Sequence, residues 1–186
     1  MNIGAAMRPK PGEVECGDSF VVCWQEDGAL VAVIDGLGHG PEAAAASGAA
    51  SKYIEEHQSD SLRSLMEGLH LTLIHTRGAA VTLMRIRPGA GEMTHSAVGN
   101  VEVVGILQQG GKPLCVPGVV GCNLSRVVER RYPIRSGDVL VTHTDGISAR
   151  FDLEHYRHLD AQAMADALLA DWGRDHDDAT CVSVCC

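Results

Sequence analysis

The chain has 186 residues and a formal net charge of −9 at pH 7, and 45% of its residues are hydrophobic while only 4% are aromatic. This length predicts one domain, residues 1–186, with a substantial aliphatic core. The acidic balance argues against nucleic acid as a partner, because phosphate binding requires a basic face.

No apolar run approaches the roughly 20 residues that a membrane span needs, and residues 1–8 lack the apolar core of a signal peptide. We therefore expect a cytoplasmic protein with no membrane partner. The seven cysteines form no pair of C-x-x-C motifs. Reduced thiols are the expected state in the cytosol, and a zinc site or regulatory disulfide at the C-terminus is the alternative.

The first half of the chain predicts two strands and two helices. Strands at 19–25 and 29–34 flank a hairpin turn, because Asp27-Gly28 tolerates positive φ. A helix opens at Pro41, since proline suits the first turn. A second helix, at 60–75, has Asp60 or Ser61 as its N-cap and leucines at helical spacing.

The second half predicts a meander of short strands, then a helix at 161–172 and a closing strand at 179–185. No repeat or linker divides the chain. Two antiparallel sheets packed face to face, with helices outside, fit this order and give an α+β fold. The strands of the meander are expected at 79–87, 92–98, 101–108, 113–117, 125–132 and 138–143, with breaks at 89–91 and 109–112.

Four acidic motifs accompany these strands: Gly17-Asp18-Ser19, Asp35-Gly36-Leu37-Gly38-His39-Gly40, Thr144-Asp145-Gly146 and Asp177-Asp178-Ala179-Thr180. Their carboxylates lie at strand ends, where several strands of one sheet can bring them together. Carboxylates that close repel one another unless a cation neutralises them. Oxygen ligands select Mg²⁺ or Mn²⁺ over Zn²⁺, so metal-assisted phosphoryl chemistry is the first hypothesis.

The ordered set of motifs resembles the metal-dependent serine/threonine protein phosphatases of the type-2C (PPM) family. It is most similar to the bacterial sporulation and stress branch, which includes a small stand-alone phosphatase of the stressosome. The resemblance implies an αββα sandwich with a dinuclear metal site at its edge, holding two or more Mn²⁺ or Mg²⁺ ions. It rests on Cys16–Phe20, Asp35–Gly38, Arg77–Ala79, Ser96–Val101, His143–Gly146 and Asp177–Thr180.

The resemblance also implies which residues bind the metals. Asp35 would bridge both ions, and the carbonyl of Gly36 would bind one of them directly or through water. Asp145 and Asp177 would bind the other ion. A simple turn after a strand is the alternative for Asp35-Gly36, but the matching motif at Asp145 favours the metal site.

Two acidic residues have less defined roles. Asp178 is either a ligand or holds a water in the second shell, and the sequence does not choose between Asp177 and Asp178 as the direct ligand. Asp18 would hold a metal-bound water. Asp18 and Asp35 are therefore catalytic as well as metal-site candidates.

His39 is the candidate general acid for the leaving seryl or threonyl oxygen, since histidine can be protonated near neutral pH. The chain departs from the family's Asp-Gly-His-Gly pattern, because Leu37 and Gly38 separate Gly36 from His39. A metal-bound water is the alternative proton donor.

The expected activity is hydrolysis of phosphoserine or phosphothreonine without a covalent intermediate, by water activated on the metals. The resemblance implies that phosphorylated STAS-domain proteins of the stressosome are the partners, and we expect a monomer. Two alternatives stay open: a non-catalytic phosphoprotein-binding module of the same fold, and a phosphatase for the antagonist of an anti-sigma factor.

Overall fold

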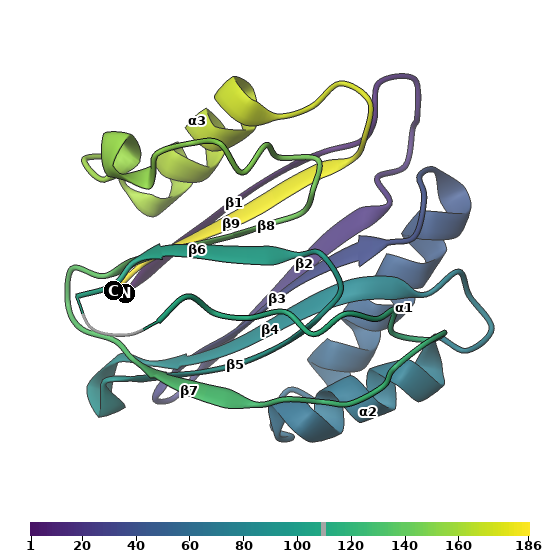
Figure 1. The fold of residues 1–186 in the computed structure, drawn as a ribbon, viewed down its shortest axis with the longest axis horizontal. Coiled ribbons are helices and arrows are strands. Elements are labelled where there is room, and N and C mark those ends of the chain that lie inside the picture. The colour runs from purple at the N-terminus through teal and green to yellow at the C-terminus, as the bar shows by residue number, and fades with distance from the viewer. Residues whose placement is uncertain (109–110) are drawn as a thin grey trace.

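Two antiparallel sheets lie face to face, with helices on both outer faces (Figure 1). This computed structural model describes residues 1–108 and 111–186. The expected α+β architecture of two packed sheets is confirmed. One sheet has the order β2-β3-β4-β5-β7 and the other β1-β9-β8-β6. The strands are β1 Asn2–Arg8, β2 Asp18–Gln25, β3 Gly28–Gly36, β4 Ala79–Arg87, β5 Glu92–Val98, β6 Glu102–Ile106, β7 Arg130–Pro133, β8 Val139–His143 and β9 Ala179–Cys185.

The helices have recognisable start signals. Helix α1, Pro41–Glu56, has Pro41 in its first turn, and α2, Leu62–Thr72, begins after Ser61, whose hydroxyl accepts a hydrogen bond from the Ser64 amide at 3.1 Å. Ser61 is therefore the N-cap, not Asp60. Helix α3, Ala161–Trp172, is capped by Asp160 in the same way. Short 3₁₀ helices occupy Pro88–Ala90 and Leu153–Tyr156.

Three apolar layers hold the sandwich together. The middle layer lies between the sheets and contains Val31, Val33, Met84, Leu140 and Val182, all fully buried. Alternate residues of the same strands face the helices, as the two-residue period of a strand requires. Helices α1 and α2 cover the five-stranded sheet, and α3 covers the four-stranded one (Figure 1).

The predicted hairpin between β2 and β3 is confirmed, since Gln25 pairs with Gly28. The role of Asp27-Gly28 in this turn differs from the expected one, because neither residue has positive φ. A Cβ at Gly28 would instead collide with the carbonyl of Ile86 on β4. Glycine here permits a close approach of backbones rather than an unusual turn.

Strand β1 is absent from the sequence prediction. It pairs with β9 along its whole length, from Asn2↔Cys185 to Arg8↔Ala179, so the two termini lie side by side. Gly4 leaves room for the start of α3, where a Cβ would collide with Ala161. The Gln162 side chain then exchanges two hydrogen bonds with the backbone of Ala5.

The predicted strand at 113–117 is wrong, and the one at 125–132 is mostly wrong. Within 113–117 only Val116 makes a bridge, to Val98, because the flanking Pro113 and Pro117 lack the N–H of a strand ladder. Ladder pairing in the second segment begins only at Arg130. Part of the predicted break at 109–112, residues 109–110, lies outside the described residues. In the part of the chain that is described, no helix is long and apolar enough to cross a membrane.

Candidate metal centre

Four strand ends meet at one edge of the sandwich and bring the acidic motifs together. Asp18 begins β2 and lies opposite Asp35, the penultimate residue of β3. Asp145 follows the end of β8, and Asp177 and Asp178 directly precede β9. Because the paired strands are antiparallel, the end of one lies beside the start of its neighbour.

A buried hydroxyl ties the two sheets together at this edge. The Thr144 hydroxyl donates to Oδ2 of Asp18 at 2.8 Å and accepts from the Thr180 amide at 3.1 Å. Asp18 is buried, with 4% of its surface exposed. Thr144 therefore hydrogen-bonds a carboxylate of the other sheet rather than its neighbour Asp145. Ser19, in contrast, bonds Ser51 of α1 at 2.8 Å.

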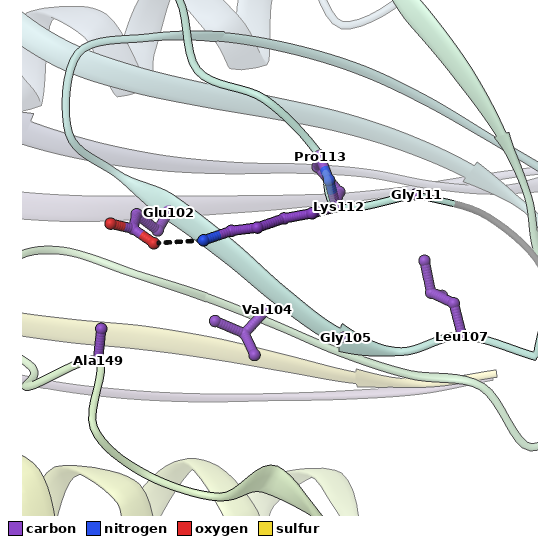
Figure 2. A pocket seen from close by; sticks show the side chains of 8 residues that line it. All are labelled: Glu102, Val104, Gly105, Leu107, Gly111, Lys112, Pro113 and Ala149. Atoms are coloured by element: carbon purple, nitrogen blue, oxygen red, sulfur yellow. Dashed lines mark hydrogen bonds and ion pairs between the residues drawn. The ribbon is translucent and has the colours of Figure 1, made fainter.

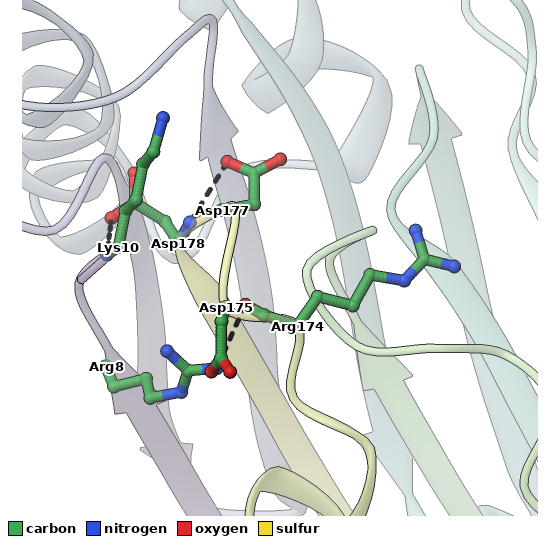
Figure 3. A network of polar contacts seen from close by, with 6 residues as sticks. All are labelled: Arg8, Lys10, Arg174, Asp175, Asp177 and Asp178. Carbon is green, nitrogen blue, oxygen red and sulfur yellow. Dashed lines mark hydrogen bonds and ion pairs between the residues drawn. The ribbon is translucent and has the colours of Figure 1, made fainter.

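Asp178 is the second buried carboxylate (Figure 3). Its Oδ1 accepts from the Lys10 amide at 2.8 Å. Its Oδ2 is buried and has no hydrogen-bond partner. A Cβ on Gly17 would come within 2.7 Å of that oxygen, so glycine preserves the space around it. A buried carboxylate oxygen without a donor fits a site in which a cation completes its environment.

The other three aspartates face a cleft of about 280 Å³. The Asn100 side chain donates to Oδ2 of Asp145 at 2.7 Å and orients that carboxylate. Asp177 accepts from the amide of Asp178 at 3.0 Å. The cleft is lined by Asp35, Leu37, Gly38, His39, Asn100, Asp145, His176 and Asp177.

Burial and mutual repulsion make two of these carboxyl groups hard to ionise. Burial raises the pKa of Asp35 to about 8, and the charges of Asp18, Asp145, Asp177 and Asp178 add to the effect. Burial raises the pKa of Asp18 to about 7, although its hydrogen bond from Thr144 opposes the shift. A cation would reverse both effects by favouring the charged form.

Among residues 1–108 and 111–186, no set of three or more His, Cys, Asp or Glu side chains is arranged to hold a metal ion. The carboxylates therefore share one edge without forming a preassembled coordination sphere. The donor set is nevertheless all oxygen, which suits Mg²⁺ or Mn²⁺. The dinuclear site, and with it the roles of Gly36 and the individual aspartates, stays a prediction.

His39 lies on the exposed wall of the cleft. Its Nδ1 is 2.7 Å from Oε1 of Glu13, in the loop before β2. This contact occupies Nδ1 and leaves Nε2 without a hydrogen-bond partner among the described residues. Glu13 could not be predicted as the partner of His39, because the two residues come from separate loops 26 residues apart.

Two basic residues upstream of Asp18, Arg8 and Lys10, are not among the residues that line the cleft. The Arg8 guanidinium donates to the carbonyl of Arg174 at 2.9 Å and pairs with Asp175 at 3.3 Å (Figure 3). Lys10 contributes its backbone amide to Asp178. Arg77, which comes nearer, pairs with Glu42 at the start of α1.

Cys16 is the cysteine nearest the acidic cluster. Burial, and after it the charge of Asp18, raises the pKa of its thiol to about 12. A thiol held protonated is a poor nucleophile. This agrees with a mechanism that forms no covalent intermediate.

Comparison with known proteins identifies the family. The family model described as "Stage II sporulation protein E (SpoIIE)" matches residues 25–186. The chain belongs to the SpoIIE family. It is therefore a PPM-type, metal-dependent phosphatase, and the family expected from the motifs is confirmed.

Relatives and solved structures agree with this assignment. "Phosphoserine phosphatase RsbX" of Bacillus subtilis (strain 168) is 28% identical over 141 residues, which is 75% of this chain and 71% of RsbX. A solved chain from "The bacterial stressosome: a modular system that has been adapted to control secondary messenger signaling" has TM-score 0.93 and 31% identity, over 97% of both chains. RsbX in complex with magnesium has TM-score 0.86 and 24% identity, over 96% of this chain and 92% of that one, and shows the common fold.

Proposed function

We propose that this chain removes phosphate from phosphoserine or phosphothreonine of STAS-domain stressosome proteins, using two or more Mn²⁺ or Mg²⁺ ions. The observation that supports this proposal most directly is that five aspartates lie together at one edge of a SpoIIE-family fold: Asp18, Asp35, Asp145, Asp177 and Asp178. The choice of substrate is supported by the likeness to RsbX and to the stressosome chain.

The chain's own residues divide the work at the cleft. Asp35, Asp145 and Asp177 line it and would hold the ions, with Asn100 orienting Asp145. Bound divalent ions would supply Lewis-acid charge neutralisation and activation of water. His39, fixed by Glu13, would deliver a proton to the leaving oxygen.

The test uses purified protein with two phosphoserine substrates, a STAS-domain protein of the stressosome and the antagonist of an anti-sigma factor. Phosphate release is measured with Mn²⁺, Mg²⁺ or Ca²⁺ and after exhaustive chelation. We expect Mn²⁺ and Mg²⁺ to support hydrolysis and Ca²⁺ to support it poorly, because Ca²⁺ prefers longer bonds and more ligands. The stressosome substrate should be hydrolysed faster.

The outcomes separate the alternatives. Full hydrolysis after chelation would remove the metal mechanism. Faster hydrolysis of the anti-sigma antagonist would keep the phosphatase and change its substrate. Binding of both phosphoproteins without hydrolysis under any metal would identify a non-catalytic binding module.

A further inference from the structure

Two adjoining cavities extend from the metal centre along strand β6. The first, of about 240 Å³, is lined by Asn100, which also lines the metal cleft. The second, of about 360 Å³, continues along the strand (Figure 2). Both are lined by Glu102, Lys112 and Pro113, so the three spaces form one path. We call the two cavities together the β6 groove.

The groove lies along an unpaired strand edge. In the described part of the chain, β8 is the only strand that pairs with β6, so the other edge of β6 has no ladder partner and faces the groove, with residues 112–115 on the groove's far side. Free edges accept extended peptides as an additional strand. An ion pair between Lys112 Nζ and Glu102 Oε2, at 3.2 Å, crosses the groove (Figure 2). The Lys112 side chain is 66% exposed and that of Glu102 43%, and ion pairs in contact with solvent contribute little, so a ligand can displace this one.

The lining of the groove is mostly apolar. Val103 and Leu114 line its first cavity, and Val104 and Leu107 line the second. Leu114 is 53% exposed, so its side chain is accessible from the groove. Leu114, Val104 and Leu107 are accessible to the alternate residues of an extended peptide, whereas Val103 is buried between the sheets.

We propose that the β6 groove binds the segment of the phosphoprotein substrate next to its phosphorylated residue, as an extended strand added to β6. This inference rests on the proposed function, because the groove begins at the cleft where the phosphate would be hydrolysed. The groove would determine which phosphoprotein is bound. The metal centre would not, because it contacts only the phosphoryl group.

The topology fixes the direction of the bound segment. All strand pairs in this sheet are antiparallel, so an added strand is expected to run antiparallel to β6. Strand β6 begins beside Asn100 and runs away from the metal centre to Ile106. An antiparallel strand therefore runs toward the metal centre. The residues that occupy the groove are those on the N-terminal side of the phosphoserine, about as many as the 5 residues of β6.

The experiment compares three substrates: p-nitrophenyl phosphate, a peptide with a five-residue apolar-alternating flank before its phosphoserine, and a peptide with the same flank after it. We expect the first peptide to exceed the second in kcat/KM by about tenfold or more, equivalent to a few ordered strand contacts. Leu114→Asp should remove this advantage and leave turnover of p-nitrophenyl phosphate unchanged.

Leu71→Asp is the matched control, because Leu71 is an exposed leucine on α2, outside the groove, with 69% of its surface exposed against 53% for Leu114. It should retain the full preference. Equal rates for the two peptides, or equal behaviour of Leu114→Asp and Leu71→Asp, would overturn the groove proposal.

Failure of the proposed function gives a different result. If no substrate, including p-nitrophenyl phosphate, is hydrolysed with Mn²⁺, the phosphatase assignment fails but the groove is still testable. Binding of the two fluorescently labelled peptides, measured by anisotropy in the presence of chelator, then shows whether the groove recognises the flank. Tighter binding of the N-terminally flanked peptide, lost in Leu114→Asp, supports the groove, and equal binding of both peptides rejects it.

Discussion

The inner and outer carboxylates of the acidic cluster differ in what surrounds them. The inner pair, Asp18 and Asp178, is buried and receives hydrogen bonds from Thr144 and from the Lys10 amide. The outer three, Asp35, Asp145 and Asp177, line the open cleft. The inner pair joins the polypeptide segments that form the edge, although Oδ2 of Asp178 has no donor and would also suit a cation. The outer three line the cleft that ions would enter, so we expect loss of an inner and of an outer carboxylate to have different effects.

The largest effect is expected from removing an outer carboxylate. Asp35→Asn keeps the shape of the side chain and removes the ligand charge. Activity should fall by more than about 100-fold, beyond the range of residues that only support ligands. The variant should stay folded and melt higher than the wild type without metal, because the pKa of Asp35 is raised by burial and by neighbouring carboxylates.

The measurements are Mn²⁺-dependent phosphate release and thermal unfolding followed by circular dichroism. Asp145→Asn is the companion variant from the other sheet. Wild-type turnover in both would place the reactive site elsewhere.

A substrate-dependent effect is expected at His39, on the exposed wall of the cleft. If His39 is the general acid, His39→Ala should slow hydrolysis of phosphoserine by about 10²–10⁴-fold. It should affect p-nitrophenyl phosphate much less, because nitrophenolate leaves without a proton. Equal losses on both substrates would indicate that His39 orders the site, and no loss on either would assign the proton to water.

Two supporting residues test the difference between the inner and outer parts directly. Thr144→Val removes the donor to buried Asp18 and should cost about 1–3 kcal/mol of unfolding free energy. Asn100→Ala removes the donor to exposed Asp145 and should change stability by less than about 0.5 kcal/mol. Both should lower activity by about 10–100-fold. Urea unfolding and initial rates check this, and equal stability losses would contradict the division.

The smallest expected effect is on stability as a function of pH. The pKa values of Asp18 and Asp35 are raised from 3.8 to about 7 and about 8, so the metal-free protein should lose stability as pH rises toward 8. Burial lowers the pKa of His95, between the sheets, from 6.5 to about 4, which raises stability as pH increases over that interval. Burial lowers the pKa of His143 as well, and both histidines oppose the carboxylates below pH 6.5, while the carboxylate effect remains between pH 6.5 and 8.

The melting temperature without metal should therefore fall between pH 6.5 and pH 8. Mn²⁺ should abolish the fall, since it favours the charged carboxylates. Asp35→Asn should reduce it. An unchanged slope in Asp35→Asn would show that another group titrates in this interval.

Much of the fold follows from local patterns. The strand at 79–87 and the helix at 161–172 are found at their predicted bounds, because alternation and helical spacing are properties of neighbouring residues. Strand β1 was not predicted, since Gly4, Ala5 and Ala6 have little strand preference and pair only because β9 offers a free edge. The apolar residues at 113–117 favour a strand, but Pro113 and Pro117 lack the amide donors that a strand ladder needs.

The sequence by itself determined the family, the order of the acidic motifs and the position of each aspartate at the end or start of a strand. Only the tertiary structure decided which carboxylates are buried and which line the cleft. It also showed that Thr144 bonds Asp18, 126 residues away, and that Asn100 orients Asp145, 45 residues away. The physical reason is that burial and hydrogen-bond partners depend on how two sheets pack, and residue spacing along one chain does not encode that packing directly.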